Sequence, residues 1–267
     1  MNVNSFFKNI RYFIKTSKSL PEVGRKMFWI YDVASKGQGN RKSKFHFKFP
    51  EPLGLLKFTV RNNGGSDAFI ISEVFEHQCY RIDVLNKDAS GPVIVDLGAN
   101  AGFTSVYFSK VFPGAKIICV EPMPNNLSVL RENLKENHVT AEVYEAAIST
   151  TDGLLEMEIS DQDYGHKVHN IEFGKAVGNQ LISVRAITIG SIMQEQKIDK
   201  IDILKIDIEG YEGVLFETNN QWLRSVDRII MEIHENISIE RITEIAKQYS
   251  FTSVTESKGN WIFSKGN

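Results

Sequence analysis

Short apolar runs alternate with amphipathic stretches from residue 92 to the end of the chain. We expect strands at 92–96, 115–120 and 141–144, separated by helices at 102–112 and 124–137. Further strands are expected at 154–159, 181–186, 203–208, 228–234, 251–255 and 260–263. Because short all-apolar strands separated by helices are covered on both faces, the pattern predicts an α/β fold with a mostly parallel sheet, closed by an antiparallel hairpin from the last two strands.

The N-terminal part of the chain has a helical pattern instead. Apolar residues recur there at helical spacing: Phe6, Phe7, Ile10, Phe13 and Ile14. We therefore expect an amphipathic helix, followed by a second helix from Pro21 to Val33. These patterns divide the chain into a basic helical N-terminal extension, residues 1–50, and a single domain, residues 51–267.

Between the extension and the sheet, 56–60 reads as a strand. The Asn-Asn-Gly-Gly stretch 62–65 has the composition of a hairpin turn after it. A helix is expected from Asp67 to Tyr80. Farther along, 160–178 is rich in glycine and histidine without periodicity, so we expect a mobile loop over the site, with an ordinary surface loop as the alternative.

Charge is distributed unevenly along the chain. The first 50 residues hold eleven Lys and Arg against Glu22 and Asp32, which gives a net charge of +9 and leaves −11 for the rest. Clustered cations attract phosphates and acidic lipid head groups, so we expect a phosphate-bearing acceptor or a peripheral membrane contact at this segment. The alternative is a basic helix face that only contacts water.

Composition limits the cellular setting. No apolar run approaches the roughly 20 residues that a membrane-spanning helix requires. Of the two cysteines, Cys79 and Cys119, the second lies inside an apolar strand and is unsuited to a disulfide. We therefore expect a soluble cytoplasmic protein without a signal peptide or transmembrane helix.

The first strand of the alternating region leads into the loop Asp96-Leu-Gly-Ala-Asn-Ala-Gly102. In an open parallel sheet, ligands bind beyond the carboxyl ends of the strands, and a glycine-rich turn lets a cofactor approach the backbone. The glycines do not follow the G-x-G-x-x-G spacing of dinucleotide-binding loops, since Phe103 stands where the last glycine belongs. Asn100 tolerates left-handed dihedrals, so the turn can still form.

The next strand ends in Glu121 and Pro122. Glu121 therefore lies beside the loop at the neighbouring strand end, where its carboxylate can accept hydrogen bonds from two ribose hydroxyls. Without a phosphate-binding loop, the expected ligand is a nucleoside that bears no pyrophosphate, which S-adenosylmethionine satisfies. Asp96 would then lie near the cationic methionine end. The alternative is that both acidic residues are merely polar strand ends.

Three motifs together resemble the FkbM-type methyltransferase family. They are the loop 96–102, Glu121-Pro122, and Leu204-Lys-Ile-Asp-Ile-Glu-Gly-Tyr-Glu212, and the similarity extends over about residues 55–235. The resemblance implies a class I methyltransferase fold, Rossmann-like with a seven-stranded sheet. It also implies methyl transfer from S-adenosylmethionine to an oxygen, usually a hydroxyl of a sugar or a polyketide.

Several residues are expected to bind the cofactor. Ala146 and Ala147 follow the third strand, where small side chains suit an adenine ring. Glu73 resembles a family glutamate that could meet the methionine moiety. The full expected set is Glu73, Asp96, Gly98, Ala99, Asn100, Gly102, Glu121, Pro122, Ala146, Ala147 and Asp207.

Methyl transfer to a hydroxyl needs in-line alignment and removal of a proton. Asp207 and Glu209 follow one strand, and Glu232 and His234 end the next, where residues two apart share a face. His234 is the first candidate for the general base, because the ordinary pKa of histidine, about 6.5, lies near neutral pH. Asp207 or Glu209 is the second. His234 could instead only orient the substrate or cap the strand.

The same four side chains could alternatively bind magnesium or manganese, although no metal is our expectation. His166 and His169 lack a nearby carboxylate at recognisable spacing and are left out of the site. Two alternatives to a methyltransferase are a non-catalytic nucleoside-binding module and a nicotinamide-dependent oxidoreductase. Nucleic acid is not expected as a substrate, because the strand after Lys205 lacks an Asn/Asp-Pro-Pro-aromatic motif and only the N-terminal segment is basic.

Overall fold

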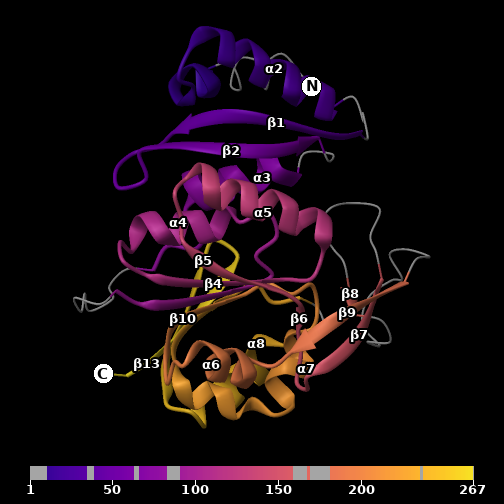
Figure 1. Ribbon diagram of the computed structural model, residues 1–267. Coiled ribbons are helices and arrows are strands. Elements are labelled where there is room, and N and C mark those ends of the chain that lie inside the picture. The colour runs from indigo at the N-terminus through magenta and orange to yellow at the C-terminus, as the bar shows by residue number, and fades with distance from the viewer. Residues whose placement is uncertain are drawn as a thin grey trace.

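A central sheet of seven strands organises the computed structural model, which describes residues 11–34, 39–62, 66–82, 91–158, 167–168, 181–234 and 237–266 (Figure 1). The strand order is β12-β13-β11-β10-β3-β4-β5. In chain order the strands are β3 (Val93–Leu97), β4 (Lys116–Glu121), β5 (Ala141–Glu145), β10 (Ile201–Ile206), β11 (Val226–Met231), β12 (Phe251–Ser257) and β13 (Asn260–Lys265). β13 alone runs in the opposite direction to the other six strands. The predicted mostly parallel sheet with a closing antiparallel hairpin is therefore confirmed.

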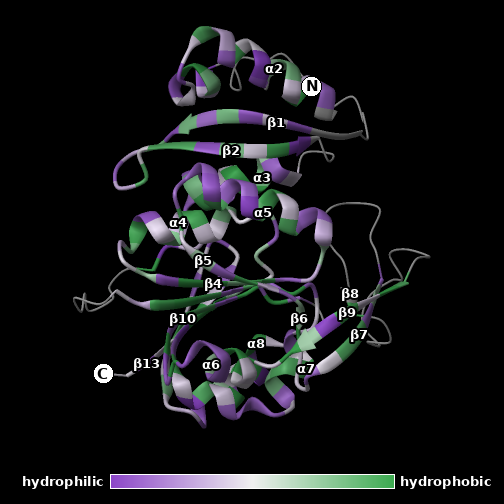
Figure 2. Ribbon diagram, in the orientation of Figure 1, coloured by the Kyte–Doolittle hydropathy of each residue, from purple (hydrophilic) through white to green (hydrophobic). Residues whose placement is uncertain are grey.

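Helices cover both faces of the central sheet. In Figure 1, α4 (Phe103–Val111) and α5 (Pro124–Glu136) lie above it, and α6 (Ile189–Gln196), α7 (Glu212–Glu217) and α8 (Ile239–Lys247) lie below. A 3₁₀ segment, Asn220–Ser225, leads into β11. Each face has its own hydrophobic core, and the colouring in Figure 2 shows hydrophobic residues along the central strands between them. Burial on both faces explains why these strands are apolar throughout rather than alternating.

A second, smaller sheet lies beside the central one. Its order is β6-β9-β7-β8, with β6 (Ala147–Ile148), β7 (Gly153–Glu158), β8 (Lys167–Val168) and β9 (Leu181–Ile187). The strands predicted at 154–159 and 181–186 are therefore present, but they belong to this sheet. The loop predicted over the site at 160–178 lies outside the described residues except for β8.

The N-terminal part forms two further layers on the α4 and α5 side (Figure 1). Their elements are α2 (Leu20–Ala34), β1 (Gly39–Lys48), β2 (Leu55–Asn62), α3 (Ser66–Ile71) and a π-helical segment, Ser72–His77. The helix expected at 67–80 is thus confirmed for most of its length. Residues 11–16 are also helical, whereas the apolar positions at 6, 7 and 10 lie outside the described residues.

Two expectations for this part were wrong. The extension was expected to be helical, but β1 is a strand that pairs antiparallel with β2. The hairpin turn was expected after β2, but β2 pairs with the strand before it, and α3 begins at Ser66. The signal for β1 was a period of two: Phe45, Phe47 and Phe49 are buried, while Lys44 and Lys48 between and beside them are exposed.

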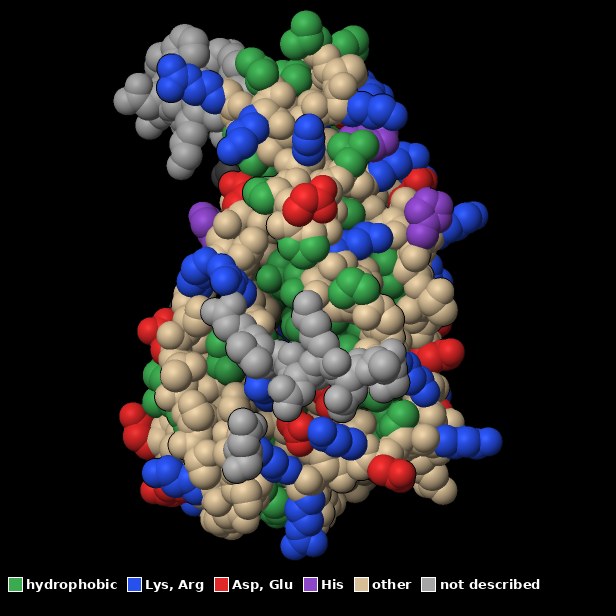
Figure 3. Space-filling view, turned by 90° about the vertical axis from the view of Figure 1, so that its left-hand side faces the viewer, with side chains coloured by type: hydrophobic (Ala, Val, Ile, Leu, Met, Phe, Trp, Pro, Cys, Tyr) green, Lys and Arg blue, Asp and Glu red, His purple; other side chains and the backbone are tan. Residues whose placement is uncertain are grey.

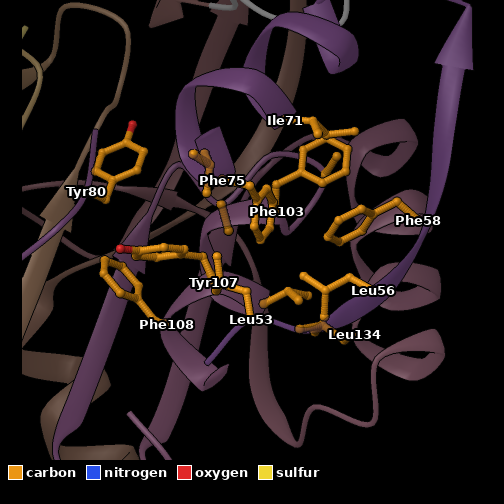
Figure 4. Close-up of a cluster of buried hydrophobic side chains, with 14 of the residues drawn as sticks. Leu53, Leu56, Phe58, Ile71, Phe75, Tyr80, Phe103, Tyr107, Phe108 and Leu134 are labelled. Atoms are coloured by element: carbon orange, nitrogen blue, oxygen red, sulfur yellow. The ribbon is translucent and has the colours of Figure 1, made fainter. Parts of the chain in front are cut away.

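The hairpin shares its core with the rest of the protein. Phe47 lies 6.0 Å from Phe58, and Phe58 lies 5.1 Å from both Phe75 and Phe103, measured between ring centroids. Figure 4 shows Phe58, Phe75 and Phe103 converging from β2, the π-helical segment and α4. The predicted division at residue 50 falls in the turn of this hairpin, and it stays a prediction.

Replacing a β1 residue tests whether the hairpin and the central sheet unfold together. Phe47 is 1% exposed, so Phe47→Ala should lower the free energy of unfolding by about 3–5 kcal/mol. Because the core is shared, we expect a single denaturation transition to shift as a whole. Phe28→Ala, at a side chain that is 66% exposed, is the control and should change little. An early separate transition with the main one unmoved would contradict the shared core.

Candidate active site

The loop after β3 has the left-handed backbone that its sequence predicted. Gly98, Asn100 and Gly102 have φ angles of 75°, 46° and 79°. A Cβ atom on Gly98 would lie 1.9 Å from the carbonyl oxygen of Asp207, so only glycine allows this close approach to the end of β10. Asn100 serves in place of a glycine, as expected. The loop backbone consequently borders the cavities directly.

Glu121 is buried beside this loop. Its Oε2 accepts a hydrogen bond from the Asn100 backbone N–H (2.9 Å), and its Oε1 accepts from the Met123 N–H (2.9 Å) and the Asn126 amide (3.0 Å). Burial raises the pKa of this carboxyl, and the three donors partly offset that effect. A carboxylate has about four acceptor positions, so one remains for a ligand rather than the two expected for ribose.

Arg61 on β2 holds the same loop from the other side. Its guanidinium forms a buried ion pair with Asp67 (2.7 Å) and donates hydrogen bonds to the side-chain oxygens of Asn100 (2.9 Å) and Asn126 (2.5 Å). Both asparagines also contact Glu121, through a backbone N–H and a side-chain amide respectively. The N-terminal hairpin therefore fixes the geometry of the loop after β3.

Two cavities meet at this loop. The first is lined by the strand ends after β4 and β5, with Glu121, Pro122, Ala146 and Ala147 among its residues. The second lies toward α3 and the end of β11. Its polar and aromatic lining residues are Ser66, Phe69, Glu73, Tyr80, Asn100, Phe103, Thr104, Lys205, Asp207, Glu209, Glu232 and His234. Four residues line both cavities: Gly98, Asn100, Asp207 and Glu209.

Most of the predicted site residues therefore come together, but two do not. Asp96 is fully buried and lines neither cavity. Gly102 also lines neither cavity and lies next to Leu130 of α5. Ala99 lines the second cavity. Asp96 still belongs to β3, and its carboxylate contacts Ser105 of α4 and Lys205 of β10, whereas the cavity begins at the turn after the strand.

Lys205 is the functional residue that the sequence reading missed. Its ammonium group lies 3.2 Å from Asp96 and 3.5 Å from Asp207, and it donates to the carbonyl oxygens of Leu97 (3.2 Å) and Gly98 (2.7 Å). Burial disfavours its charge, but the two carboxylates outweigh that effect and raise its pKa. The available signal was a lysine inside the apolar run Ile203-Leu-Lys-Ile206, since a buried charge requires a partner.

The second cavity is strongly acidic. Glu73 and Glu232 face Asp207 across it, and Tyr80 donates to Asp207 Oδ2 at 3.4 Å. Desolvation of its carboxyl in the cavity and the neighbouring charge of Asp207 raise the pKa of Glu232 to about 7, although the residue as a whole is exposed to solvent. The same two causes raise the pKa of Glu73. Glu232 is therefore close to half ionised at neutral pH.

The surroundings of His234 do not favour a neutral imidazole. β11 ends at Met231, so His234 lies just beyond the strand rather than on it. Its Nδ1 is 3.0 Å from the buried carboxylate of Glu212, and its Nε2 is 3.6 Å from Glu209. Burial opposes the charged ring, but these carboxylates outweigh it and raise the pKa to about 9. The ordinary pKa on which the general-base expectation rested does not apply here.

Within the described part of the chain, no group of three or more His, Cys, Asp and Glu side chains is arranged to hold a metal ion. The alternative of a divalent cation at Asp207, Glu209, Glu232 and His234 thus gains no support. Both cysteines are buried free thiols. No helix among the described residues is long and apolar enough to cross a membrane. The expected compartment stays a prediction.

The residues that line the cavities fit S-adenosylmethionine. Glu121 offers a carboxylate acceptor for a ribose hydroxyl, and Ala146 and Ala147 leave room for a flat ring. Asp207 and Glu73 line the second cavity with carboxyl groups, which suit the ammonium and sulfonium groups of this cofactor. Lys205, the one lysine or arginine among the lining residues of these two cavities, is neutralised by Asp96 and Asp207, so a pyrophosphate finds no free cation there.

The sheet order, the loop after β3 and the paired cavities define a class I, S-adenosylmethionine-dependent methyltransferase. Residues 96–253 match the Methyltransferase FkbM domain, and the chain belongs to that family. It is 27% identical over 225 residues to "Methyltransferase sdnD" of Sordaria araneosa, covering 72% of this chain and 85% of that protein.

Two further relatives have more specific names. The chain is 22% identical to "31-O-demethyl-FK506 methyltransferase FkbM" of Streptomyces tacrolimicus, covering 73% of this chain and 85% of the relative. It is also 22% identical to "Hexuronic acid methyltransferase AglP" of Haloferax volcanii, covering 62% and 65%.

Glu121→Gln tests the ribose contact. An amide offers one acceptor oxygen and turns an NH₂ group toward donors, so the affinity for S-adenosylhomocysteine should fall about 10- to 150-fold, equivalent to about 1.5–3 kcal/mol. Calorimetric titration measures it. The control is Glu145→Gln at the end of the neighbouring strand β5, where the side chain is 56% exposed. Equal affinity in the two variants would remove Glu121 from the cofactor site.

Lys205→Met tests the buried charge. Without the ammonium group, Asp96 is left buried and unpaired, so the free energy of unfolding should fall by about 3–5 kcal/mol. Asp96→Asn combined with Lys205→Met should recover part of that loss. Lys200→Met removes an exposed ion pair with Asp227 just before the same strand and should cost under about 1 kcal/mol. If the double variant lost as much free energy of unfolding as the two single variants together, Lys205 and Asp96 would not be coupled.

Proposed function

We propose that this methyltransferase transfers a methyl group to a hydroxyl oxygen of a sugar, glycan or secondary metabolite. The observation that carries the proposal is the second cavity, which combines acceptors for hydroxyl hydrogens with apolar surface. Glu73, Glu209 and Glu232 line this cavity together with Phe69 and Ile70 of α3. Carboxylates bind hydroxyl groups, and apolar side chains pack on the carbon skeleton that bears them.

Two observations support this choice of acceptor. Negative charge around Asp207 repels the phosphates of a nucleic acid, which basic surfaces bind instead. Two relatives have names that fit this choice. The Streptomyces tacrolimicus relative is named for methylation of the O-demethylated metabolite 31-O-demethyl-FK506, and the Haloferax volcanii relative for methylation of a hexuronic acid. A non-catalytic binding module would not require acid–base groups beside the wall shared by both cavities.

Proton removal is assigned to Glu232. Bound S-adenosylmethionine supplies an electrophilic methyl group, and the acceptor hydroxyl must lose a proton as the new bond to oxygen forms. Glu232 is partly ionised at neutral pH, and it lines the cavity beside Asp207. His234, held as an imidazolium by Glu212, orients Glu209 and donates toward the acceptor. Asp207 and Glu209 position the reacting groups at the wall shared by the two cavities.

The substrate class is tested with methyl-labelled S-adenosylmethionine and a panel of free sugars, nucleotide-linked sugars and hydroxylated metabolites. The expected product is a methyl ether that mass spectrometry locates at oxygen. Acceptors whose hydroxyl is already methylated are the control and should stay unlabelled. Label on nitrogen or carbon, or on RNA, would contradict the proposal. Binding of S-adenosylhomocysteine without turnover on any acceptor would favour the binding module.

The pH dependence distinguishes Glu232 from His234. A base must be unprotonated to act, so kcat/KM should rise with pH and level off above about 7 for Glu232, but above about 9 for His234. Glu232→Gln should lower kcat by about 10²–10⁴-fold and abolish the limb near 7. Glu240→Gln, exposed on α8, is the control. A rising limb near 9, with kcat/KM still increasing between pH 7 and 9, that disappears in His234→Ala would return the role of base to His234.

A further inference from the structure

The outer face of helix α2 carries exposed apolar side chains. Leu20 is 76% exposed, Phe28 66% and Tyr31 64%, and Ile14 in the preceding helical turn is 54% exposed. Positions 20, 28 and 31 lie on one face of the helix, with Gly24 between them also exposed. Among the described residues, half of the exposed large hydrophobic side chains fall within these 18 residues. Figure 3 shows hydrophobic and basic side chains gathered at this end of the molecule.

The opposite face of α2 already anchors the helix to the protein. Trp29 is buried and donates a hydrogen bond to the carbonyl oxygen of Arg61, and the Lys26 ammonium lies 3.9 Å from the centroid of the Phe47 ring. Glu22 is buried, and its Oε1 lies 3.0 Å from Nδ1 of His46. The helix is thus held by its inner face, and packing on the protein does not account for Leu20, Phe28 and Tyr31. Exposed apolar surface of this kind marks an interaction site.

The exposed charges of residues 11–34, around the apolar stripe, are all positive. Arg11, Lys15, Lys18 and Arg25 are exposed, and in the part of the chain that the structure describes none of them forms an ion pair with a carboxylate. The acidic residues of 11–34 are the buried Glu22 and the half-buried Asp32. A second copy of this face would bring like charges together, which disfavours self-association. Exposed apolar residues flanked by cations are instead typical of a helix that lies on an anionic bilayer.

A hollow beside the stripe strengthens this assignment. It lies between α2 and β1, and Arg25, Phe28 and Trp29 are among its lining residues. Lys42 and Lys44 also line it, but they pair with Glu132 and Glu136 of α5, which leaves Arg25 as the cation available to a ligand. The exposed ring of Phe28 next to the Arg25 guanidinium suits the boundary between lipid head groups and acyl chains.

We propose that the outer face of α2 docks this methyltransferase on a bilayer surface that contains anionic phospholipid. Ile14, Leu20, Phe28 and Tyr31 enter the interface, and Arg11, Lys15, Lys18 and Arg25 attract the head groups. The assignment is independent of the acceptor, since α2 lies in the outermost layer, away from the central sheet (Figure 1).

Vesicle sedimentation with the full chain tests the docking. We expect binding to vesicles of phosphatidylserine and phosphatidylcholine at low salt, at least about tenfold weaker binding to phosphatidylcholine alone, and release at high salt. The variant Phe28→Ser with Tyr31→Ser and the variant Lys15→Glu with Arg25→Glu should each bind at least about tenfold more weakly. All four side chains are exposed, and melting temperatures check that the variants fold.

Matched controls lie on other surfaces. Leu154→Ser changes an apolar side chain that is 76% exposed on β7, and Lys247→Glu reverses an exposed charge on α8 at the opposite end of the molecule. Both should bind vesicles within about twofold of the unaltered protein. The proposal would be overturned if the control variants lost as much vesicle binding as the α2 variants. It would also be overturned if the protein bound neutral vesicles equally well or bound no vesicles. A dimer in analytical ultracentrifugation that Phe28→Ser with Tyr31→Ser dissolves would overturn it too, since the face would then join two copies.

Discussion

The ion pairs of the buried Lys205 hold together the loop after β3 and the end of β10, which border both cavities. Lys205 sits on β10 beneath the loop after β3, paired with Asp96 on one side and Asp207 on the other. Without it, Asp96 would be buried without a counter-charge, Asp207 would lose its cationic partner at the cavity wall, and the carbonyl oxygen of Gly98 would lose its donor. The ammonium group therefore fixes both the loop backbone and the net charge of the cavity wall.

Support from outside the alternating region completes the site. Arg61 lies in β2, upstream of the matched residues 96–253, yet it holds Asn100 and Asn126 in place, and both of these contact Glu121. Polar contacts continue along α5, where Asn133 accepts from the Thr59 backbone N–H and donates to the carbonyl oxygen of Ala101. The N-terminal hairpin is thus a structural part of the catalytic unit as well as a platform for α2.

Environment decides the chemistry of the ionisable groups in the second cavity. Desolvation and the nearby carboxylate of Asp207 raise the pKa of Glu232 to about 7, the range of a general base at neutral pH. His234 faces carboxylates of Glu209 and Glu212, which stabilise its protonated form. The neighbouring carboxylates thus raise both pKa values, and this is why the proposed mechanism assigns proton removal to Glu232 rather than to His234.

Local pattern was sufficient for the parallel sheet, the left-handed Asn100 and the positions of Glu121 and Asp207, because strand period, turn chemistry and strand ends depend on nearby residues. Tertiary structure decided the rest. Pairing of β1 with β2, the burial of Asp96 and the pKa of His234 depend on partners distant in the chain. Register, desolvation and charge pairing are properties of segments brought together in space, so no local pattern specifies them.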